Sequence, residues 1–246
     1  MRNLLDSLAP EVLHVWSILL TQPEAIVRGL EEHLSMDELR RADRYRRELD
    51  RTRYVVAHGA LRELLADYTS QTPRNISFGH TATGKPFLIN DQGEQRLRFN
   101  LSHAGEWAIV ALVLSTDVGI DIEQIDSDVS VEAVAERFFS RSEFEALREV
   151  PSEQRTVVFF TAWTRKEAYV KARGEGIAGR LRGFSISIAP EQIPILLTDS
   201  IDAHATLHWR IYDLDIARGY AAAIAAEGAT HRLRTMRWTP PLPSCT

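Results

Sequence analysis

The order of structural signals along the chain occurs twice, and this repetition constrains the fold more than any other feature. The first half opens with a strand-like run at 12–20, continues through a helical region at 35–68 and ends on extended segments, the last at 107–114. The second half opens with an extended segment at 118–125, passes through helical signals and returns to extended segments. This order favours two α+β halves over an alternating βαβ chain. We therefore predict an α+β fold with halves at 1–116 and 117–246.

Local signals mark where helices begin and end. Ser35 with Glu38, and Ser140 with Glu143, are spaced as capping boxes. A long helix is predicted from Pro151-Ser152 to about Arg173, with Gly174 as its C-cap. Residues 105–108 and 218–221 are weakly similar in sequence, and each segment opens an apolar strand. This similarity has two interpretations, internal duplication and coincidence.

Composition limits the class of protein. With 246 residues, 44% hydrophobic and 26% charged, the chain is too balanced for a disordered, collagen-like or coiled-coil protein. A net charge of −5 argues against a surface made for nucleic acid. The longest apolar runs, 107–116 and 219–226, are far shorter than the roughly 20 residues that span a bilayer. The first six residues lack the apolar run of a signal peptide, and Cys245 is the single cysteine. We expect a soluble, cytoplasmic protein without disulfides and without a membrane or nucleic-acid partner.

The first chemical signal is the segment Gly119-Ile120-Asp121-Ile122-Glu123. Side chains alternate along a strand, so Asp121 and Glu123 would project from one face, about 7 Å apart. Paired carboxylates suit a hard cation such as Mg²⁺. For this pair alone, a half-buried strand with a solvated acidic face is the more frequent explanation.

The second signal lies on the predicted long helix. Glu167 and Lys171 are four residues apart and share a helix face, with Trp163 one turn earlier. A carboxylate beside a lysine can complete a metal site and present a cation to phosphate oxygens. The alternative is an exposed Glu–Lys pair that only stabilises the helix.

The third signal is basic. Seven arginines fall within fourteen residues, at positions 40, 41, 44, 46, 47, 51 and 53. The planar guanidinium suits phosphate recognition, although a solvated helix laced with ion pairs would explain most of the seven. Lys85 and His103 are further candidates for phosphate or hydroxyl contacts, and a lone histidine after a strand is more often structural.

Three motifs in this order resemble the 4′-phosphopantetheinyl transferases of the larger, surfactin-synthetase-activating type. They are Phe99-Asn100-Leu101-Ser102-His103, the segment 119–123, and Trp163-x-x-Lys166-Glu167-Ala168-x-x-Lys171, with Arg137-Phe138-Phe139-Ser140 and Glu143 between them. The resemblance covers residues 35 to 226. It implies two similar halves related by a pseudo-twofold, with coenzyme A in the cleft between them. The implied reaction moves the phosphopantetheine arm of coenzyme A to a serine of an apo acyl or peptidyl carrier protein and releases 3′,5′-ADP.

The resemblance also implies roles for single residues. Asp121, Glu123 and Glu167 would gather Mg²⁺ against the pyrophosphate, and Lys171 would stabilise its charge. Glu167 would serve as base for the incoming serine, directly or through a metal-bound water, two routes that the sequence leaves open.

Further implied roles concern coenzyme A and the carrier. Arg53 aligns with an arginine at the 3′-phosphate, and Arg62 supports this register. Lys85, Ser102 and His103 match positions that line the nucleotide and phosphate side of the pocket.

Carrier docking would use an apolar patch made of Val129, Val131, Val134 and Phe138. Helix packing is the alternative explanation for these four residues. Ala104 stands where the family often has serine. Because one chain supplies both halves of the site, the resemblance implies a monomer.

Two competing functions remain at this point. A metal-dependent phosphodiesterase or nuclease also uses acidic pairs with a nearby lysine, although the chain lacks a widespread basic surface. A binding module for coenzyme A or carrier that has lost activity is disfavoured by the joint presence of Asp121, Glu123, Glu167 and Lys171.

Overall fold

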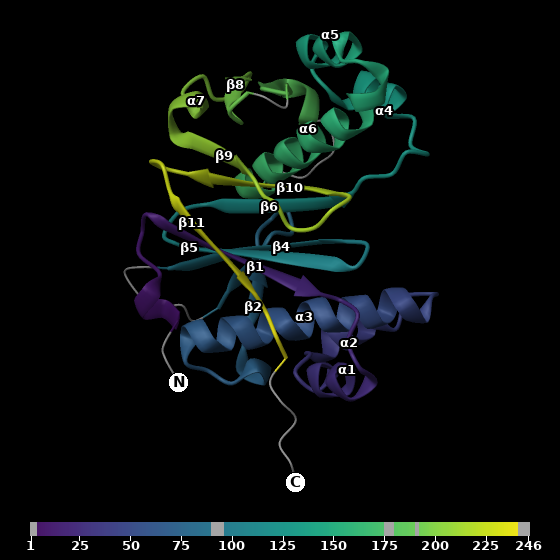
Figure 1. The fold of residues 1–246 in the computed structure, drawn as a ribbon. Helices are drawn as coiled ribbons and strands as arrows, with labels where there is room; N and C mark the ends of the chain where they lie inside the picture. The colour runs from purple at the N-terminus through teal and green to yellow at the C-terminus, as the bar shows by residue number, and fades with distance from the viewer. Residues whose placement is uncertain (1–3, 90–95, 175–179, 190–191, 241–246) are drawn as a thin grey trace.

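Two β-sheets stacked face to face, each covered by a long helix, form the body of the molecule (Figure 1). The computed structural model describes residues 4–89, 96–174, 180–189 and 192–240. Cys245 and the rest of 241–246 lie outside these residues. The first sheet has the strand order β11 (Arg232–Arg237), β1 (Val12–Leu19), β5 (Trp107–Leu114), β4 (Leu97–Ala104). The second sheet has the order β6 (Val118–Gln124), β10 (Tyr220–Glu227), β9 (Trp209–Asp213).

Alternating side chains along the strands create three apolar layers. In β5, Val110 and Leu112 pack toward helix α3 (Glu48–Thr69), whereas Ile109 and Ala111 pack toward the second sheet. Both faces of β5 are therefore buried, which explains its almost continuous apolar sequence. Helix α6 (Ser152–Arg173) covers the outer face of the second sheet. The order of layers is helix, sheet, sheet, helix (Figure 1).

The two halves repeat one topology. The order β1-β5-β4 of the first half recurs as β6-β10-β9, and all of these pairings are antiparallel. Each long helix has 22 residues and ends on a left-handed C-cap residue. Each half also carries two shorter helices before the long helix and a two-stranded ribbon after it. In the first half these are α1 (Glu24–Glu31), α2 (Met36–Ala42) and β2 (Phe78–His80) with β3 (Pro86–Leu88), and in the second α4 (Val131–Phe138), α5 (Arg141–Glu149) and β7 (Phe184–Ile186) with β8 (Leu196–Asp199).

Most local signals in the sequence correspond to these elements. Both capping boxes are formed, at Ser35–Glu38 and Ser140–Glu143, and Gly174 has the positive φ, 63°, expected of the C-cap of α6. The helical region expected at 35–68 is instead two helices, α2 and α3, joined through 43–47. Helix α1 lies in a stretch for which no element was predicted.

The last strand crosses back to the first half. Strand β11 pairs in parallel with β1, with Leu233 opposite Leu13 and Arg234 opposite His14. Residues 117–246 therefore contribute one strand, β11, to the sheet of the first half. The boundary at 116/117 stays a prediction. Within the described ranges, no helix has the length and apolar character needed to cross a membrane.

Candidate active site

The candidate site lies where an edge of the first sheet meets an edge of the second. Strand β4 ends one sheet and β6 ends the other. The Asn100 side chain on β4 accepts a hydrogen bond from the backbone N–H of Ile120 on β6, with the two atoms 2.9 Å apart. This bond satisfies an edge N–H that would otherwise be buried without a partner. Sequence reasoning missed this residue, although Asn100 shares a strand face with Ser102 in the Phe-Asn-Leu-Ser-His motif.

Ser102, Asp121 and Lys171 form one hydrogen-bonded triangle across this junction. The Ser102 hydroxyl donates to Asp121 Oδ1 at 2.9 Å, and Lys171 Nζ donates to the same Oδ1 at 2.5 Å and to Ser102 Oγ at 3.0 Å. Asp121 is only 2% exposed. Its second oxygen, Oδ2, is buried and has no hydrogen-bond partner among the described residues. The fold thus buries a carboxylate and leaves one of its oxygens available to a cation.

Helix α6 reaches this junction because β6 has glycine at position 119. A Cβ on Gly119 would lie 2.2 Å from the carbonyl oxygen of Ala168 and 2.2 Å from the backbone nitrogen of Ala172. Only a glycine permits this approach, which places Glu167 and Lys171 of α6 beside the acidic face of β6. Gly119 is a second residue whose role the sequence analysis missed. The segment 119–123 was predicted to be a strand, but the close approach of a helix, which requires a glycine there, was not predicted.

Three carboxylates share this space and oppose one another's ionisation. Burial first, and the charge of Asp121 next, raise the pKa of Glu123 to about 7 and that of Glu167 to about 7. Lys171 opposes the shift in both, and the Trp163 side chain does so for Glu123. Burial also raises the pKa of Asp121, against the effect of Lys171. A cation among these groups would relieve both the burial cost and the repulsion.

The residues fit a divalent metal ion by charge and by ligand type. Carboxylate oxygens are the preferred ligands of Mg²⁺, and Asp121 Oδ2 is an unused acceptor. In the part of the chain that the structure describes, no group of three His, Cys, Asp or Glu side chains is already arranged to hold a metal. The Lys171 ammonium instead provides the positive charge beside Asp121.

The arginines of the arginine-rich segment differ in their partners among the described residues. Arg40 pairs with Asp37 at 2.7 Å, and Arg51 pairs with Glu31 and Asp43, as the ion-pair alternative predicts. Arg53 differs, since its Nε is buried and lacks a hydrogen-bond partner among the described residues. A guanidinium held in this way can receive an oxyanion.

His103 lies near positively charged side chains of both the arginine-rich segment and the triangle. It lies exposed near the end of β4, one residue after Ser102. Its pKa is lowered, first by desolvation and then by nearby cationic side chains, those of His58, Lys171, Arg41 and Arg53. The α2–α3 segment and α6 therefore present positive charge to the same region.

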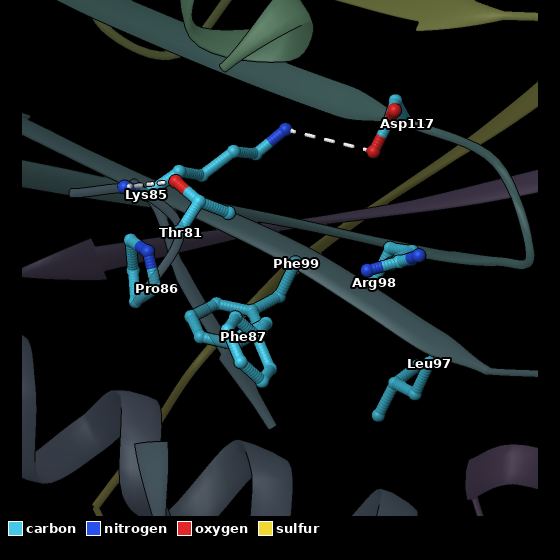
Figure 2. Close-up of a pocket in the computed structure, with 8 residues that line it drawn as sticks. All are labelled: Thr81, Lys85, Pro86, Phe87, Leu97, Arg98, Phe99 and Asp117. Carbon is cyan, nitrogen blue, oxygen red and sulfur yellow. Dashed lines mark hydrogen bonds and ion pairs between the residues drawn. The ribbon is translucent and has the colours of Figure 1, made fainter. Parts of the chain in front are cut away.

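Lys85 lies apart from the triangle, against the end of α6. Its ammonium donates to the carbonyl of Ala172 at 2.7 Å and lies 3.9 Å from a carboxylate oxygen of Asp117. It borders a hollow of about 50 Å³ that also receives Arg98, whose Nε is buried without a hydrogen-bond partner in the described ranges (Figure 2). The structure thus gathers Ser102, Asp121 and Lys171 and gives Lys85 no contact with them.

The apolar residues considered for carrier docking lie on and beside α4. Val131 is buried, and the three others are partly buried and pack against the core of the second half. Phe138 contacts the Trp163 ring edge to face, with centroids 5.7 Å apart. Helix packing accounts for these contacts.

Comparisons with known proteins cover both halves. Residues 117–225 match the model of the 4′-phosphopantetheinyl transferase superfamily, and residues 23–115 match that of the 4′-phosphopantetheinyl transferase N-terminal region. The chain is 36% identical over 222 residues to the 4′-phosphopantetheinyl transferase HetI of a Nostoc species, covering 90% of each chain. It is 30% identical over 194 residues to the 4′-phosphopantetheinyl transferase Sfp of Bacillus subtilis, covering 78% of this chain and 82% of the relative. A solved structure of Thermotoga maritima holo-[acyl-carrier-protein] synthase aligns with a TM-score of 0.36 at 20% identity, covering 47% of this chain and 64% of the other.

Proposed function

The chain belongs to the 4′-phosphopantetheinyl transferase superfamily, and from this premise we infer that it transfers the 4′-phosphopantetheine arm of coenzyme A to a serine of an apo carrier protein. The serine oxygen forms a bond to the β-phosphorus of coenzyme A, and the bond from that phosphorus to the bridging oxygen breaks, releasing 3′,5′-ADP. The observation that carries the proposal for this site is the buried Asp121, with one oxygen bound by Lys171 and the other open.

We assign Asp121, Glu123 and Glu167 as the residues that would hold Mg²⁺. Burial raises the pKa of all three carboxyl groups, and the charge of Asp121 raises the pKa of Glu123 and Glu167 further, so a divalent cation would offset an unfavourable charge in each. When bound, the metal would supply positive charge to the pyrophosphate oxygens as charge builds on them.

Lys171 and Glu167 have separate tasks in this scheme. The Lys171 ammonium, held by Asp121 and Ser102, lies where it can stabilise the pyrophosphate. We assign Glu167 as the residue that accepts the proton of the attacking serine hydroxyl; in the metal-free protein, burial and then the charge of Asp121 raise its pKa to about 7.

The remaining residues would bind coenzyme A itself. The unpartnered Nε of Arg53 and the cationic surroundings of His103 support a role for both at the 3′-phosphate of the nucleotide. The Lys85 ammonium adds positive charge at the end of α6. The partner would be an acyl or peptidyl carrier, whether from fatty-acid, polyketide or peptide synthesis.

The test is a transfer assay read by mass spectrometry. The protein, coenzyme A, Mg²⁺ and one of several apo carrier proteins are mixed, and the intact carrier is weighed. We expect the carrier to gain the mass of one phosphopantetheine, and Asp121→Asn and Glu167→Gln to lower kcat by about 10²–10⁴-fold.

Glu145→Gln is the matched control. Glu145 lies exposed on α5 and pairs with the exposed Arg141, so its loss should leave the rate unchanged. No mass gain with any carrier would refute the proposed function. Metal-dependent cleavage of a phosphodiester or of DNA in its place would establish the competing activity.

A further inference from the structure

Lys166, inside the motif of the second half, points away from the candidate site. Its side chain is 0% exposed, and its ammonium donates to both oxygens of Glu143 at 2.9 and 2.8 Å and to the carbonyl of Phe184 at 3.0 Å. The ammonium also lies 4.0 Å from the centre of the Phe184 ring. All three of its N–H bonds are therefore used, and none is directed at the candidate site.

Glu143 extends this contact to two further elements. Its Oε2 accepts from the backbone N–H of Ser140 at 2.7 Å, closing the capping box of α5. Its Oε1 accepts from the backbone N–H of Ile186 in β7 at 2.8 Å. One buried pair thus connects α5, α6 and β7, and we call Lys166 with Glu143 the second-half pin.

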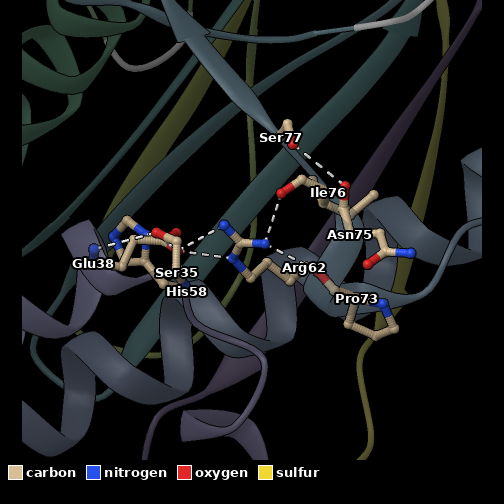
Figure 3. Close-up of polar contacts among 8 residues, drawn as sticks. All are labelled: Ser35, Glu38, His58, Arg62, Pro73, Asn75, Ile76 and Ser77. Carbon is tan, nitrogen blue, oxygen red and sulfur yellow. Dashed lines mark hydrogen bonds and ion pairs between the residues drawn. The ribbon is translucent and has the colours of Figure 1, made fainter.

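An equivalent pair lies in the first half (Figure 3). Glu38, of the capping box of α2, accepts from Arg62 Nε at 2.8 Å, and Arg62 also donates to the carbonyls of Pro73 at 3.0 Å and Ile76 at 2.8 Å, just before β2. The guanidinium lies 5.1 Å from the centre of the Phe78 ring. We call Arg62 with Glu38 the first-half pin.

The two pins occupy the same place in the repeated topology. Arg62 is the fifteenth residue of α3 and Lys166 the fifteenth residue of α6. Each lies over the ring of the first residue of the following ribbon strand, Phe78 in β2 and Phe184 in β7. A buried ion pair is often no more stabilising than an apolar pair of the same size, so stability alone is a weak reason for two such pairs. Their hydrogen bonds are directional, and each pair connects a long helix to neighbouring elements of its own half.

We propose that Lys166 is a positioning residue that sets the rotation of α6 and, through it, the placement of Glu167 and Lys171 against Asp121. Lys166 directly precedes Glu167, and a rotation of α6 would move Glu167 and Lys171 together. The first-half pin does the same for α3, which carries Arg53 and His58. This inference rests on the proposed function for its kinetic readout only.

The kinetic experiment compares the two pins. Lys166→Met should lower kcat about 10–100-fold with KM for coenzyme A within twofold, because small misplacements of reacting groups cost rate. Arg62→Met, the matched control, should raise KM for coenzyme A several-fold with kcat within threefold. Lys166→Arg should keep kcat within about threefold, since arginine fills the equivalent position of the first half. The same fall in the same parameter for both methionine variants would overturn the proposal.

A double variant separates positioning from stability. In Glu143→Gln/Lys166→Met neither charge of the second-half pin is left buried, and the single carbonyl oxygen of glutamine can still accept from one of the two backbone N–H groups, that of Ser140 or that of Ile186. The unfolding midpoint should therefore recover part of the way toward that of the wild type. Under the proposal kcat stays low. Recovery of both the midpoint and kcat would make Lys166 a structural residue only and would refute the proposal.

A second readout does not depend on transfer activity. Mn²⁺ binding, followed by electron paramagnetic resonance, should weaken several-fold in the double variant and stay unchanged in Arg62→Met. Unchanged Mn²⁺ affinity in the double variant would contradict the positioning role. If the wild type transferred nothing to any carrier, the proposed function would fail, while this binding comparison would still decide the role of Lys166.

Discussion

The two oxygens of Asp121 have different surroundings, and this asymmetry organises the candidate site. Oδ1 accepts from both Ser102 and Lys171, whereas Oδ2 is buried without a partner in the described structure. The bonds to Oδ1 fix the orientation of the carboxylate, and they reach it from β4 and from α6. The site is therefore preorganised by protein groups on one side and left open on the other.

The raised pKa of Glu167 predicts a cost in stability that substitution removes. Its pKa of about 7 in the folded protein exceeds the ordinary value of 4.5, so its contribution is fully present below pH 4.5 and is lost as the pH rises through 7. We expect metal-free Glu167→Gln to be more stable than the wild type by about 2 kcal/mol at pH 8 and equal to it near pH 4. Urea unfolding in the presence of a chelator at the two pH values measures this difference. A variant less stable than the wild type at pH 8 would show that Glu167 is not under strain from burial.

Arg53 should act on binding rather than on chemistry. Its guanidinium is partly buried and unpaired at Nε, whereas Arg40 is exposed and already paired with Asp37. We expect Arg53→Ala to raise KM for coenzyme A about tenfold, the effect of losing one charge-assisted hydrogen bond, with kcat unchanged. Arg40→Ala is the control and should leave both constants unchanged. An unchanged KM in Arg53→Ala would exclude a phosphate role.

At the scale of elements, local signals predicted well where both the capping residue and the apolar period were clear. The bounds of β5, the extent of α6 and both capping boxes follow from neighbouring residues alone. The break between α2 and α3 was not predicted, because the arginine-rich stretch at 43–47 contains neither glycine nor proline and consists largely of good helix formers. The pairing of β11 with β1 joins residues more than two hundred positions apart, and no local pattern encodes it.

The candidate site also has a part that local patterns predicted and a part that they did not. Asp121 and Glu123 share a strand face, and Glu167 and Lys171 share a helix face, so periodicity predicted these pairs. The distances between the pairs, and the contact of Ser102 with both Asp121 and Lys171, depend on how β4, β6 and α6 pack. Tertiary packing also separates Lys85 from the triangle and directs the Lys166 side chain into the protein interior. Neither feature could be predicted from local patterns.

Gly119 sets the contact between β6 and α6, and its replacement should be costly. A Cβ at this position would lie 2.2 Å from two backbone atoms of α6, which cannot move independently of the helix. We expect Gly119→Ala to destabilise the protein by about 3 kcal/mol or more and to lower transfer activity as α6 is displaced. Urea unfolding gives the first quantity and the transfer assay the second.

Gly29 in α1 is the matched control for this substitution. Apart from its chain neighbours and the backbone of its own helix, no described atom lies within 4 Å of the position that its Cβ would take. In an exposed helix, Gly→Ala stabilises by about 0.5–1 kcal/mol through helix propensity and the entropy of the unfolded chain. Opposite signs for the two variants are expected, and equal small effects would mean that β6 and α6 are not tightly packed.

At the scale of the whole molecule, the net charge of −5 conceals a division of charge. Three carboxylates gather at the junction of β6 and α6, while Arg41, Arg53 and His58 act on the same region from the first half. A small polyanion bound with a divalent cation matches this division better than a long nucleic acid, which would need positive charge over a wider surface. The proposed coenzyme A site therefore draws on residues of both halves.

The core between the sheets should make the two halves unfold as one unit. It contains twelve buried residues drawn from both halves, among them Val15 and Ile109 from the first sheet and Ile120 and Ile224 from the second. Exposing it would cost on the order of 10–20 kcal/mol, more than the net stability of most domains. Strand β11 and the bond between Asn100 and Ile120 add further links between the halves.

Native-state hydrogen exchange measures this coupling directly. In low concentrations of denaturant, peptides from the central strands β5 and β10 should exchange with the same free energy of opening and the same dependence on denaturant. The short helix α7 (Ala205–His208), which lies outside this core, should exchange faster and serves as the control for local opening. Coupling through the inter-sheet core requires β5 and β10 to behave alike, since neither sheet keeps its inner face covered when the other unfolds. A lower opening energy in β10 than in β5 would instead show that the second half opens while the first stays folded, and that the repeated halves are independent folding units.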